Sequence, residues 1–361
     1  MSNVNYQEPN FDQIHFKEAP NVRHQVVEKD GIAPKHYHAS SIFPEYFKID
    51  NQWHLAADSR MDSVVVIDNF NPVSLRVTEF RNLKKGDRVI LGRSENASEG
   101  IYVHPSGFDY VSNSATDSFA FRQGRSRETA FSVDYDSLYE LLRNEKKSNG
   151  KITWVLGTSI SLDQGSRLAL TNLIKAGYVD TIICGNALLA FDLEMASFNS
   201  VWGQKVFTKE QNSYFNYYET INLVREYGSL SAFVKSGIPK DGFVKACIEH
   251  DVELIIAGSI RDRYTLPESI NDVYQAQDKM RAAIKETSAI IMVSAILFSI
   301  ASGNMTPSFN IFDGQVRPVY MYVVDLQEFS ANKLADRGTL TAKTLVTNAQ
   351  DFIKNIARAL T

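Results

Sequence analysis

The sequence has few cysteines, no long apolar run and little net charge. Its two cysteines, Cys184 and Cys247, stand among apolar neighbours, so we predict two buried, reduced thiols. The longest nearly apolar run, residues 289–301, is too short to cross a bilayer, and the first residues lack the basic start and apolar centre of a signal peptide. A formal net charge of -4 with interspersed signs offers no basic surface for nucleic acid. We therefore expect a cytoplasmic protein that binds small molecules and neither nucleic acid nor membrane.

Familiar catalytic and nucleotide motifs are also missing. No G-x-G-x-x-G, the usual dinucleotide fingerprint, follows a predicted strand, and no G-x-x-x-x-G-K-[ST], the motif of the P-loop, occurs. No Ser/His/Asp or Cys/His arrangement can be argued from the spacing. His36 and His38 form the only histidine cluster, and no cysteine or carboxylate stands nearby at ligand spacing. We predict an ordinary surface pair and no metal site.

What is present is an ordinary globular composition, 44% hydrophobic and 22% charged, with two patterns along the chain. Residues 1–133 are rich in short β-branched and aromatic segments separated by turn residues, which predicts a β-rich domain for substrate binding or oligomerisation. A connecting helix is expected over 134–150, with Asp134 as its N-cap and the polar SNG at its end. The predicted strands are Glu45–Asp50, Ser63–Asn69, Val73–Phe80, Asp87–Gly92 and Ile101–His104.

Residues 151–361 alternate apolar strands with amphipathic helices. The strands KITWVLG, DTIICG, VELIIAG, AIIMVSA and VYMYVVD are nearly continuous apolar runs, the pattern of strands that are buried on both faces. Helices are expected after them, among others over Asn271–Lys285, Ala331–Arg337 and from Ala349 onward. The pattern predicts an α/β domain with a parallel sheet, preceded by the smaller β-rich domain.

Ligands of parallel sheets bind at the carboxyl ends of the strands, where this sequence places glycines and short polar side chains. Glycine lets a backbone approach a ligand closely, and the start of the following helix offers free N–H groups to phosphate. These features suit a dinucleotide, although Asp325 could either bond a ribose or cap the next helix. The candidate residues are Gly157, Thr158, Gly185, Asn186, Gly258, Ser259, Ile260 and Asp325.

Several separated motifs resemble the lysine-oxoglutarate reductase/saccharopine dehydrogenase family. They are GYVDTIICGNALLAFDLE, LIIAGSIRD with LPESINDVYQAQDKMR, SIASGNMTPS and VVDLQEFSANKLADRGT, with weaker matches in YFKIDNQW, LKKGDRVILG and GRSRE. Characterised members of that family are NAD-dependent ornithine cyclodeaminases of archaea and the C-terminal domains of cyanobacterial arginine-degrading enzymes. The resemblance covers residue 151 to the C-terminus and, less closely, the β-rich part.

The resemblance implies a Rossmann-related sheet of the deoxyhypusine-synthase-like kind, tightly held NAD and an amino-acid substrate. In the family's chemistry the nicotinamide takes a hydride from the α-carbon, the side-chain amine attacks the resulting imine, ammonia leaves and the hydride returns. Ornithine then yields proline without net oxidation. The resemblance adds Gly303, Asn304 and Asp336 to the cofactor-binding candidates, and it implies a homodimer or homotetramer.

That chemistry requires a cation for the substrate carboxylate and a carboxylate or similar base near the amine. Arg261 and Asp262, at the end of a predicted strand, are the first candidates, although they could be only a surface ion pair or a turn. Arg127 and Glu128, with Arg125 in GRSRE, form a second set that could equally be a solvated loop.

Asp192 and Glu194, on the helix that follows Gly185 and Asn186, could bond substrate or ribose, or could favour the helix dipole.

The sequence departs from the family at positions where its members have histidines. Phe191, Phe298 and an aromatic run with Tyr214, Phe215, Tyr217 and Tyr218 stand there instead. If these rings line the site, ornithine itself is in doubt; if they line the core, nothing functional follows. The expectation is therefore an NAD-dependent ornithine cyclodeaminase-like lyase, with an NAD(P)-dependent amino- or imino-acid dehydrogenase and a non-catalytic dinucleotide-binding protein as alternatives.

Overall fold

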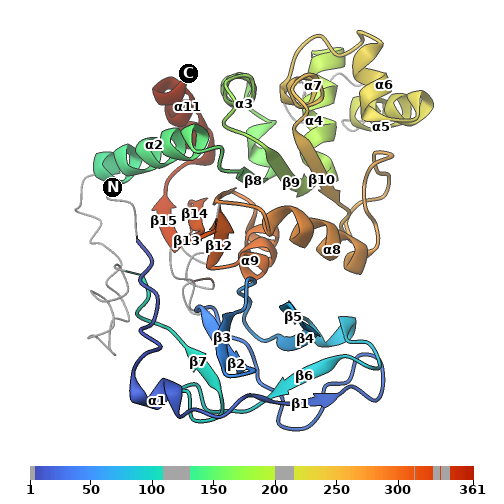
Figure 1. Cartoon of the computed structure of the whole chain (residues 1–361). Helices are drawn as coiled ribbons and strands as arrows, with labels where there is room; N and C mark the ends of the chain where they lie inside the picture. Colours follow the sequence, from blue (N-terminus) through green and yellow to red (C-terminus); the bar gives the residue numbers. More distant parts are fainter. Residues whose placement is uncertain (1–4, 109–130, 200–214, 313, 328–333, 335–341) are drawn as a thin grey trace.

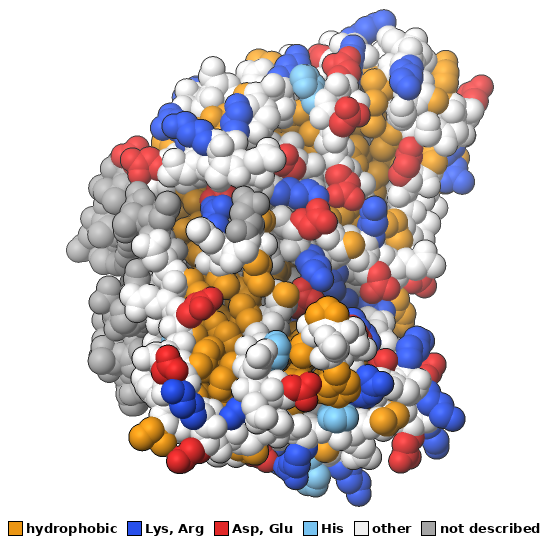
Figure 2. Space-filling model, viewed as in Figure 1, with side chains coloured by type: hydrophobic (Ala, Val, Ile, Leu, Met, Phe, Trp, Pro, Cys, Tyr) orange, Lys and Arg blue, Asp and Glu red, His pale blue; other side chains and the backbone are white. Residues whose placement is uncertain are grey.

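The computed structural model describes residues 5–108, 131–199, 215–312, 314–327, 334 and 342–361. In this part of the chain a β-rich domain lies beside an α/β domain, and helices α8 and α9 lie between the large sheet and the β-rich domain (Figure 1). No helix among these residues is long and apolar enough to cross a membrane. On the face shown in Figure 2, basic and acidic side chains are interspersed over both domains.

The α/β domain is built on six parallel strands, which confirms the predicted fold class. Their order across the sheet is β10-β9-β8-β11-β14-β15, so the chain starts in the middle, moves to one edge and then returns to build the other half. The strands are β8 (Ile152–Leu156), β9 (Thr181–Gly185), β10 (Glu253–Ala257), β11 (Ala289–Val293), β14 (Tyr320–Asp325) and β15 (Ala342–Val346).

Alternate side chains of each strand enter two separate cores. Trp154 and Leu156 face one apolar cluster, whereas Val155 between them faces the other. Helices α2 (Phe131–Lys147), α3 (Gln164–Lys175), α4 (Asn186–Phe198), α5 (Phe215–Tyr227), α6 (Leu230–Lys235), α7 (Phe243–Glu249) and α11 (Ala349–Leu360) contribute to the first cluster, and α8 (Val273–Ile284) and α9 (Ile296–Met305) to the second. Burial on both faces explains why the strands are continuous apolar runs.

Both cysteines are fully buried free thiols, as predicted, and burial raises the pKa of each thiol. Helices α8 and α11 begin close to the predicted positions, with Asp272 and Asn348 as their N-caps. Helix α2 begins at Phe131, before the expected cap Asp134, and its Leu138 and Leu142 pack in the core of the α/β domain.

The β-rich domain has two antiparallel sheets. One has the order β1-β6-β4-β5 and the other β3-β2-β7. The five predicted strands are β2 (Glu45–Ile49), β4 (Val64–Phe70), β5 (Val73–Thr78), β6 (Arg88–Leu91) and β7 (Ile101–Val103), while β1 (Arg23–Val26) and β3 (Gln52–Leu55) were not predicted. A short helix, α1 (Ile14–Lys17), precedes them.

The prediction of a surface histidine pair is wrong for His38. His38 is buried, and its Nε2 lies 3.1 Å from Oε2 of the buried Glu45. His36 is exposed and has a φ of +63°, so the backbone is not extended there and the two side chains do not share a face.

Polar groups hold the two domains together. The Glu79 carboxylate accepts hydrogen bonds from Arg81 of its own domain and from Arg281 of α8, each at 2.6 Å, and Arg81 also bonds Asp278 of α8 at 2.7 Å. Lys285, just after α8, pairs with Asp58 at 2.9 Å. Beyond α9, a hairpin of β12 (Phe309–Phe312) and β13 (Gln315–Pro318) precedes β14.

Candidate functional site

The strand order places a topological switch point at the carboxyl ends of β8 and β11, and we call this position the crevice after the place where ligands of open α/β sheets bind. β8 and β11 are neighbours in the sheet, but the strand that follows β8 in the chain, β9, lies on one side of the pair and the strand that follows β11 in the sheet, β14, lies on the other. Ligands of open α/β sheets bind at such a switch point. Leu156 pairs with Val293 across these strands, and the Gly157 N–H donates to the Val293 carbonyl at 2.9 Å. The strand-end glycines predicted from the sequence therefore lie along one edge of the sheet.

At this crevice two backbone segments touch, and Gly157 makes the contact possible. A Cβ atom on Gly157 would lie 1.7 Å from the carbonyl oxygen of Ser294, so any larger residue is excluded. Ser294 has a φ of +52°, a left-handed conformation that is uncommon outside glycine and is enriched at functional sites. The ends of β8 and β11 are therefore in direct backbone contact at this point.

Three helices begin at this edge without a side-chain cap. They are the 3₁₀ helix η2 (Thr158–Ile160), α4 and α9, whose N-cap residues are Gly157, Gly185 and Ala295. By contrast, side chains cap α3, α6, α8 and α11. A helix start without a side-chain cap leaves N–H groups for other partners, and α4 and α9 are long enough to add the positive end of a helix dipole, which favours an anion such as phosphate.

Arg261 and Asp262 form a tight turn after β10. The Ser259 N–H donates to Asp262 Oδ2 at 2.8 Å, and the Asp262 N–H donates to the Ser259 carbonyl at 3.0 Å. Asp262 therefore shapes the turn, whereas the exposed Arg261 forms no ion pair with any described residue. The guanidinium group of Arg261 is available to a ligand carboxylate within this part of the chain.

Asp325 lies on the other side of the crevice. It ends β14, next to β11, and its Oδ1 accepts a hydrogen bond from the Gln327 N–H at 3.2 Å. Strands lie about 4.8 Å apart, so the ends of β10 and β14 are separated by roughly 19 Å. A ligand that reaches both Asp325 and the Arg261 turn must be elongated.

Other predicted cofactor residues differ in exposure. Ile260 is fully exposed, and the exposed Leu297 of α9 and Leu326 after β14 give the same edge an apolar rim. Asn186, in contrast, is fully buried with its side chain hydrogen bonded to neighbouring protein groups.

Gly303 packs against Leu334, since a Cβ at Gly303 would lie 2.4 Å from the Leu334 side chain, while Asn304 next to it is exposed. Arg125, Arg127, Glu128, Tyr214 and Asp336 lie outside the described residues.

The aromatic side chains flank the end of β9 on both sides. The Phe298 ring would lie 3.4 Å from a Cβ on Gly185, so this ring covers the strand end from α9. The ring of Tyr217 lies 5.1 Å from that of Phe191, which packs against the core. Burial raises the pKa of Tyr217 to about 12, and the negative charge of Asp262 adds to this effect. Phe298 and Tyr217 thus lie next to the end of β9 and the residue that follows it, whereas Phe191 packs against Tyr217 and the core.

Asp192 belongs to a buried ion pair that the sequence did not predict. The carboxylate accepts hydrogen bonds from Arg167 Nε at 2.6 Å and from the Val244 N–H at 2.9 Å. Arg167 also reaches Asp241 at 3.0 Å, so the pair joins α3, α4 and the start of α7. Asp192 is the seventh residue of α4, beyond the first turn where an acidic residue favours the dipole.

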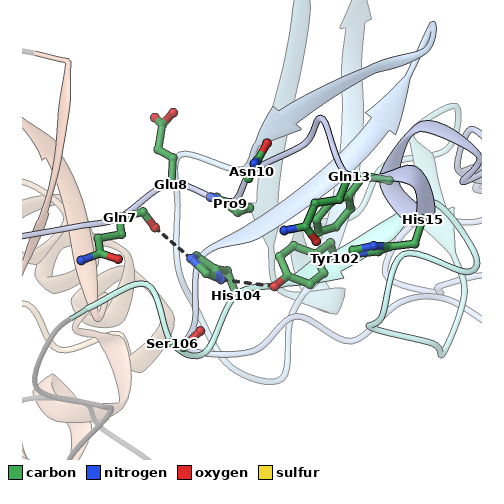
Figure 3. A pocket seen from close by; sticks show the side chains of 10 residues that line it. Gln7, Glu8, Pro9, Asn10, Gln13, His15, Tyr102, His104 and Ser106 are labelled. Carbon is green, nitrogen blue, oxygen red and sulfur yellow. Dashed lines mark hydrogen bonds between the residues drawn. The ribbon is translucent and has the colours of Figure 1, made fainter.

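A cavity of about 410 Å³ lies elsewhere, in the β-rich domain (Figure 3). It is bounded by the N-terminal segment from Gln7 to Phe16 and by the end of β7. His104 Nε2 lies 2.8 Å from the Gln7 carbonyl, and Nδ1 lies 3.4 Å from the Tyr102 hydroxyl (Figure 3). Burial lowers the pKa of His104. None of the strand-end residues lines this cavity.

Comparison with known proteins agrees with the fold of the α/β domain. The family model described as arginine dihydrolase ArgZ-like, C-terminal, Rossmann fold matches residues 137–356. Ornithine cyclodeaminase of Methanococcus maripaludis is 28% identical over 100% of this chain and 82% of its own length, and that of Methanopyrus kandleri is 30% identical over 96% and 79%. The bifunctional arginine dihydrolase/ornithine cyclodeaminase ArgZ of Synechocystis is 28% identical over 95% of this chain but only 47% of its own length.

Two solved structures add to these similarities. An LOR/SDH protein from Methanococcus maripaludis superimposes with a TM-score of 0.81 at 28% identity, over 94% of this chain and 98% of its own. The ternary complex of AgrE with ornithine and NAD+ gives a TM-score of 0.58 at 26% identity, over 95% of this chain and 46% of its own. Because the family model covers more than half of the sequence, the chain belongs to the ArgZ-like C-terminal Rossmann-fold family.

Proposed function

We propose that this protein is an NAD-dependent ornithine cyclodeaminase-like lyase, which converts ornithine or a related amino acid to a cyclic imino acid with release of ammonia. Family membership and the relatives named ornithine cyclodeaminase support the proposal. The observation that carries it in this chain is the exposed Arg261 beside Asp262, at the same sheet edge as three uncapped helix N-termini. One edge thereby combines an anion-binding region with an amino-acid-binding group.

The residues at the crevice fit NAD. The uncapped starts of η2 and α4 would offer N–H groups to a pyrophosphate, and the exposed apolar side chains at this edge suit the faces of the rings. Asp325 would bond a ribose hydroxyl. Bound NAD would supply reversible hydride transfer at the substrate α-carbon, which explains a reaction without net oxidation. Thr158, Gly258, Ser259, Ile260, Gly303, Asn304 and Asp336 remain proposed cofactor contacts.

Two groups of the β10 turn have separate roles in this proposal. The Arg261 guanidinium group binds the α-carboxylate, because its planar fork bonds both oxygens at once. The Asp262 carboxylate has a second oxygen beyond the one that holds Ser259, and this oxygen accepts a proton from the substrate amine. Arg127 and Glu128 are proposed to complete the site from the β-rich domain. The Phe298 ring makes the pocket wall apolar on the α9 side.

The first test is a product analysis. The purified protein is incubated with ornithine and NAD, and proline, ammonia and NADH are measured. Proline and ammonia without accumulation of NADH support the proposal. NADH formed in equal amount to product would replace it by the dehydrogenase alternative, and bound NAD without turnover of ornithine, lysine or diaminobutyrate would replace it by the non-catalytic alternative.

The second test is Asp262→Asn. The amide oxygen of asparagine can still accept the Ser259 N–H, so the turn is kept and only the charge and basicity are lost. We expect kcat to fall by about 100-fold or more, with an unchanged dissociation constant for NAD. Asp251→Asn is the matched control, because Asp251 is exposed at the opposite end of β10 and has a φ of +54° that asparagine tolerates. Turnover of Asp262→Asn equal to that of the control would remove Asp262 from the reaction.

A further inference from the structure

Asn186 lies at the carboxyl edge of the sheet, yet its side chain faces protein and not the crevice. The side chain is fully buried, and its amide group has four partners. Oδ1 accepts hydrogen bonds from the Leu266 N–H at 2.8 Å and the Ser269 hydroxyl at 3.1 Å. Nδ2 donates to the Tyr217 hydroxyl at 3.3 Å and, more weakly, to the Tyr264 carbonyl at 3.4 Å.

These four contacts use the whole hydrogen-bonding capacity of the group. A carboxamide has two N–H donors and two acceptor lone pairs, and each has a protein partner here. No donor or acceptor is left for a cofactor. Three of the partners belong to the segment between β10 and α8, which is the segment that carries Arg261 and Asp262.

The turn with Arg261 and Asp262 is fixed at both ends. At its start, the Gly258 N–H donates to the Ile270 carbonyl at 2.8 Å, which continues the edge of β10. At its end, Tyr264 is held by Asn186 only two residues after Asp262. Between these points the turn closes on itself through Ser259 and Asp262. Asn186, the first residue after β9, thus ties the end of this turn to the start of α4.

We propose that Asn186 is a positioning residue, which fixes the Arg261–Asp262 turn against the end of β9 and orients the Tyr217 hydroxyl beside it. The functional part of this inference rests on the proposed function, because it takes the turn as the substrate-binding element. The role differs from cofactor binding, to which the sequence had assigned Asn186. A buried anchor of this kind holds its partners more firmly than an exposed contact does.

The segment between β10 and α8 also has two hydrogen bonds nearer the surface, with which the Asn186 bonds can be compared. Arg225 donates to the Thr265 carbonyl at 2.9 Å and stacks over Tyr264 at 5.0 Å, and Glu268 accepts from the Leu230 N–H at 2.6 Å. The Arg225 bond is exposed to solvent, so water can replace it when it is lost. The Asn186 bonds to Leu266 and Tyr217 are buried, so water replaces them less readily than it replaces the Arg225 bond.

The test compares Asn186→Ala with Ser269→Ala, which removes one partner, and with Arg225→Ala, which removes an outer contact. Asn172→Ala is the control, since Asn172 is exposed on α3. Hydrogen exchange of residues 258–270 is measured in each protein without substrate, together with kcat, KM and the dissociation constant for NAD. We expect exchange of 258–270 to rise at least about 10-fold in Asn186→Ala and less in the other variants. We expect kcat to fall about 100-fold, as a 1 Å misplacement of reacting groups does, with NAD affinity unchanged.

Two outcomes would overturn the inference. Wild-type exchange of residues 258–270 in Asn186→Ala would show that the segment does not depend on Asn186. Weaker NAD binding with unchanged kcat would make Asn186 a cofactor contact. If Asn186→Ala does not fold, Ser269→Ala decides: exchange and kcat equal to those of Asn172→Ala would contradict the inference. The exchange measurement needs no turnover, so it tests the anchor even if the protein does not act on ornithine.

Discussion

Gly157→Ala tests the crevice most directly. The new Cβ would lie 1.7 Å from the Ser294 oxygen and 2.6 Å from the Ser294 carbonyl carbon, and real Cβ atoms essentially never come closer than 3.0 Å to such atoms. The two backbone segments must therefore separate by at least 1.3 Å, the difference between 3.0 and 1.7 Å. The clash is between main chains, so no side chain can rotate away.

The separation would disturb the hydrogen bonds that hold the two strand ends. Gly157 N–H bonds to Val293 and Ser294 N–H bonds to Val324, each at 2.9 Å. Overpacking of this kind costs about 1–3 kcal/mol, and we expect the upper part of that range because both partners are backbone. A shift above 1 Å at the cofactor crevice should also lower kcat by about 100-fold.

Urea unfolding followed by circular dichroism gives the stability change, and titration with NAD followed by protein fluorescence gives the binding change. Gly165→Ala is the matched control: it lies in α3, its Cβ would meet only side-chain atoms at 3.2 Å or more, and alanine favours a helix by up to about 1 kcal/mol. Gly157→Ala with the stability and NAD affinity of Gly165→Ala would refute the reasoning.

Two further predictions concern buried charges outside the crevice. Asp192→Asn should lower the free energy of unfolding, measured with urea, by about 3–5 kcal/mol, because it leaves Arg167 buried without its main counter-charge. A loss below about 1 kcal/mol would show that the exposed Asp241 compensates. Burial lowers the pKa of His104 in the folded protein. As the pH falls, the unfolded chain therefore takes up a proton at this residue at a higher pH than the folded protein does. The contribution of neutral His104 to the free energy of unfolding should be present above about pH 6.5 and decline below it. Urea midpoints at about pH 7.5 and about pH 5.5 should differ more in the wild type than in His104→Gln, and equal differences would contradict this assignment.

The sheet and the glycines at its carboxyl edge could be predicted from the sequence because they depend on local patterns. A strand that is buried on both faces must be a continuous apolar run, and the run ends where glycine or a polar residue begins the next turn. This is why Gly157, Gly185, Gly258 and Asp325 were expected at strand ends, where they lie. Strands without that pattern, such as β1 and β15, were not predicted. β1 is exposed along its whole length, so it has no apolar periodicity.

The partners of polar side chains could not be predicted in the same way. Asp192 meets Arg167 and Asn186 meets Leu266 across 25 and 80 residues, and the buried His38 meets the buried Glu45. A sequence shows that such a side chain can bond, but it does not show which distant group comes within 3 Å. Asp192 and Asn186 were therefore considered for ligand contacts that the fold replaces with protein partners.

The sequence by itself determined the five apolar strands in their order along the chain, the glycines at the strand ends and the family, since these follow from local hydrophobic periodicity and from motifs in a fixed order. Only the tertiary structure decided that Gly157 touches Ser294, that three helix starts at one edge lack caps and that Asn186 faces away from the crevice. The physical reason is that burial and hydrogen bonding depend on distances between segments far apart in the chain, and these distances are set when the two halves of the sheet pack around β8 and β11.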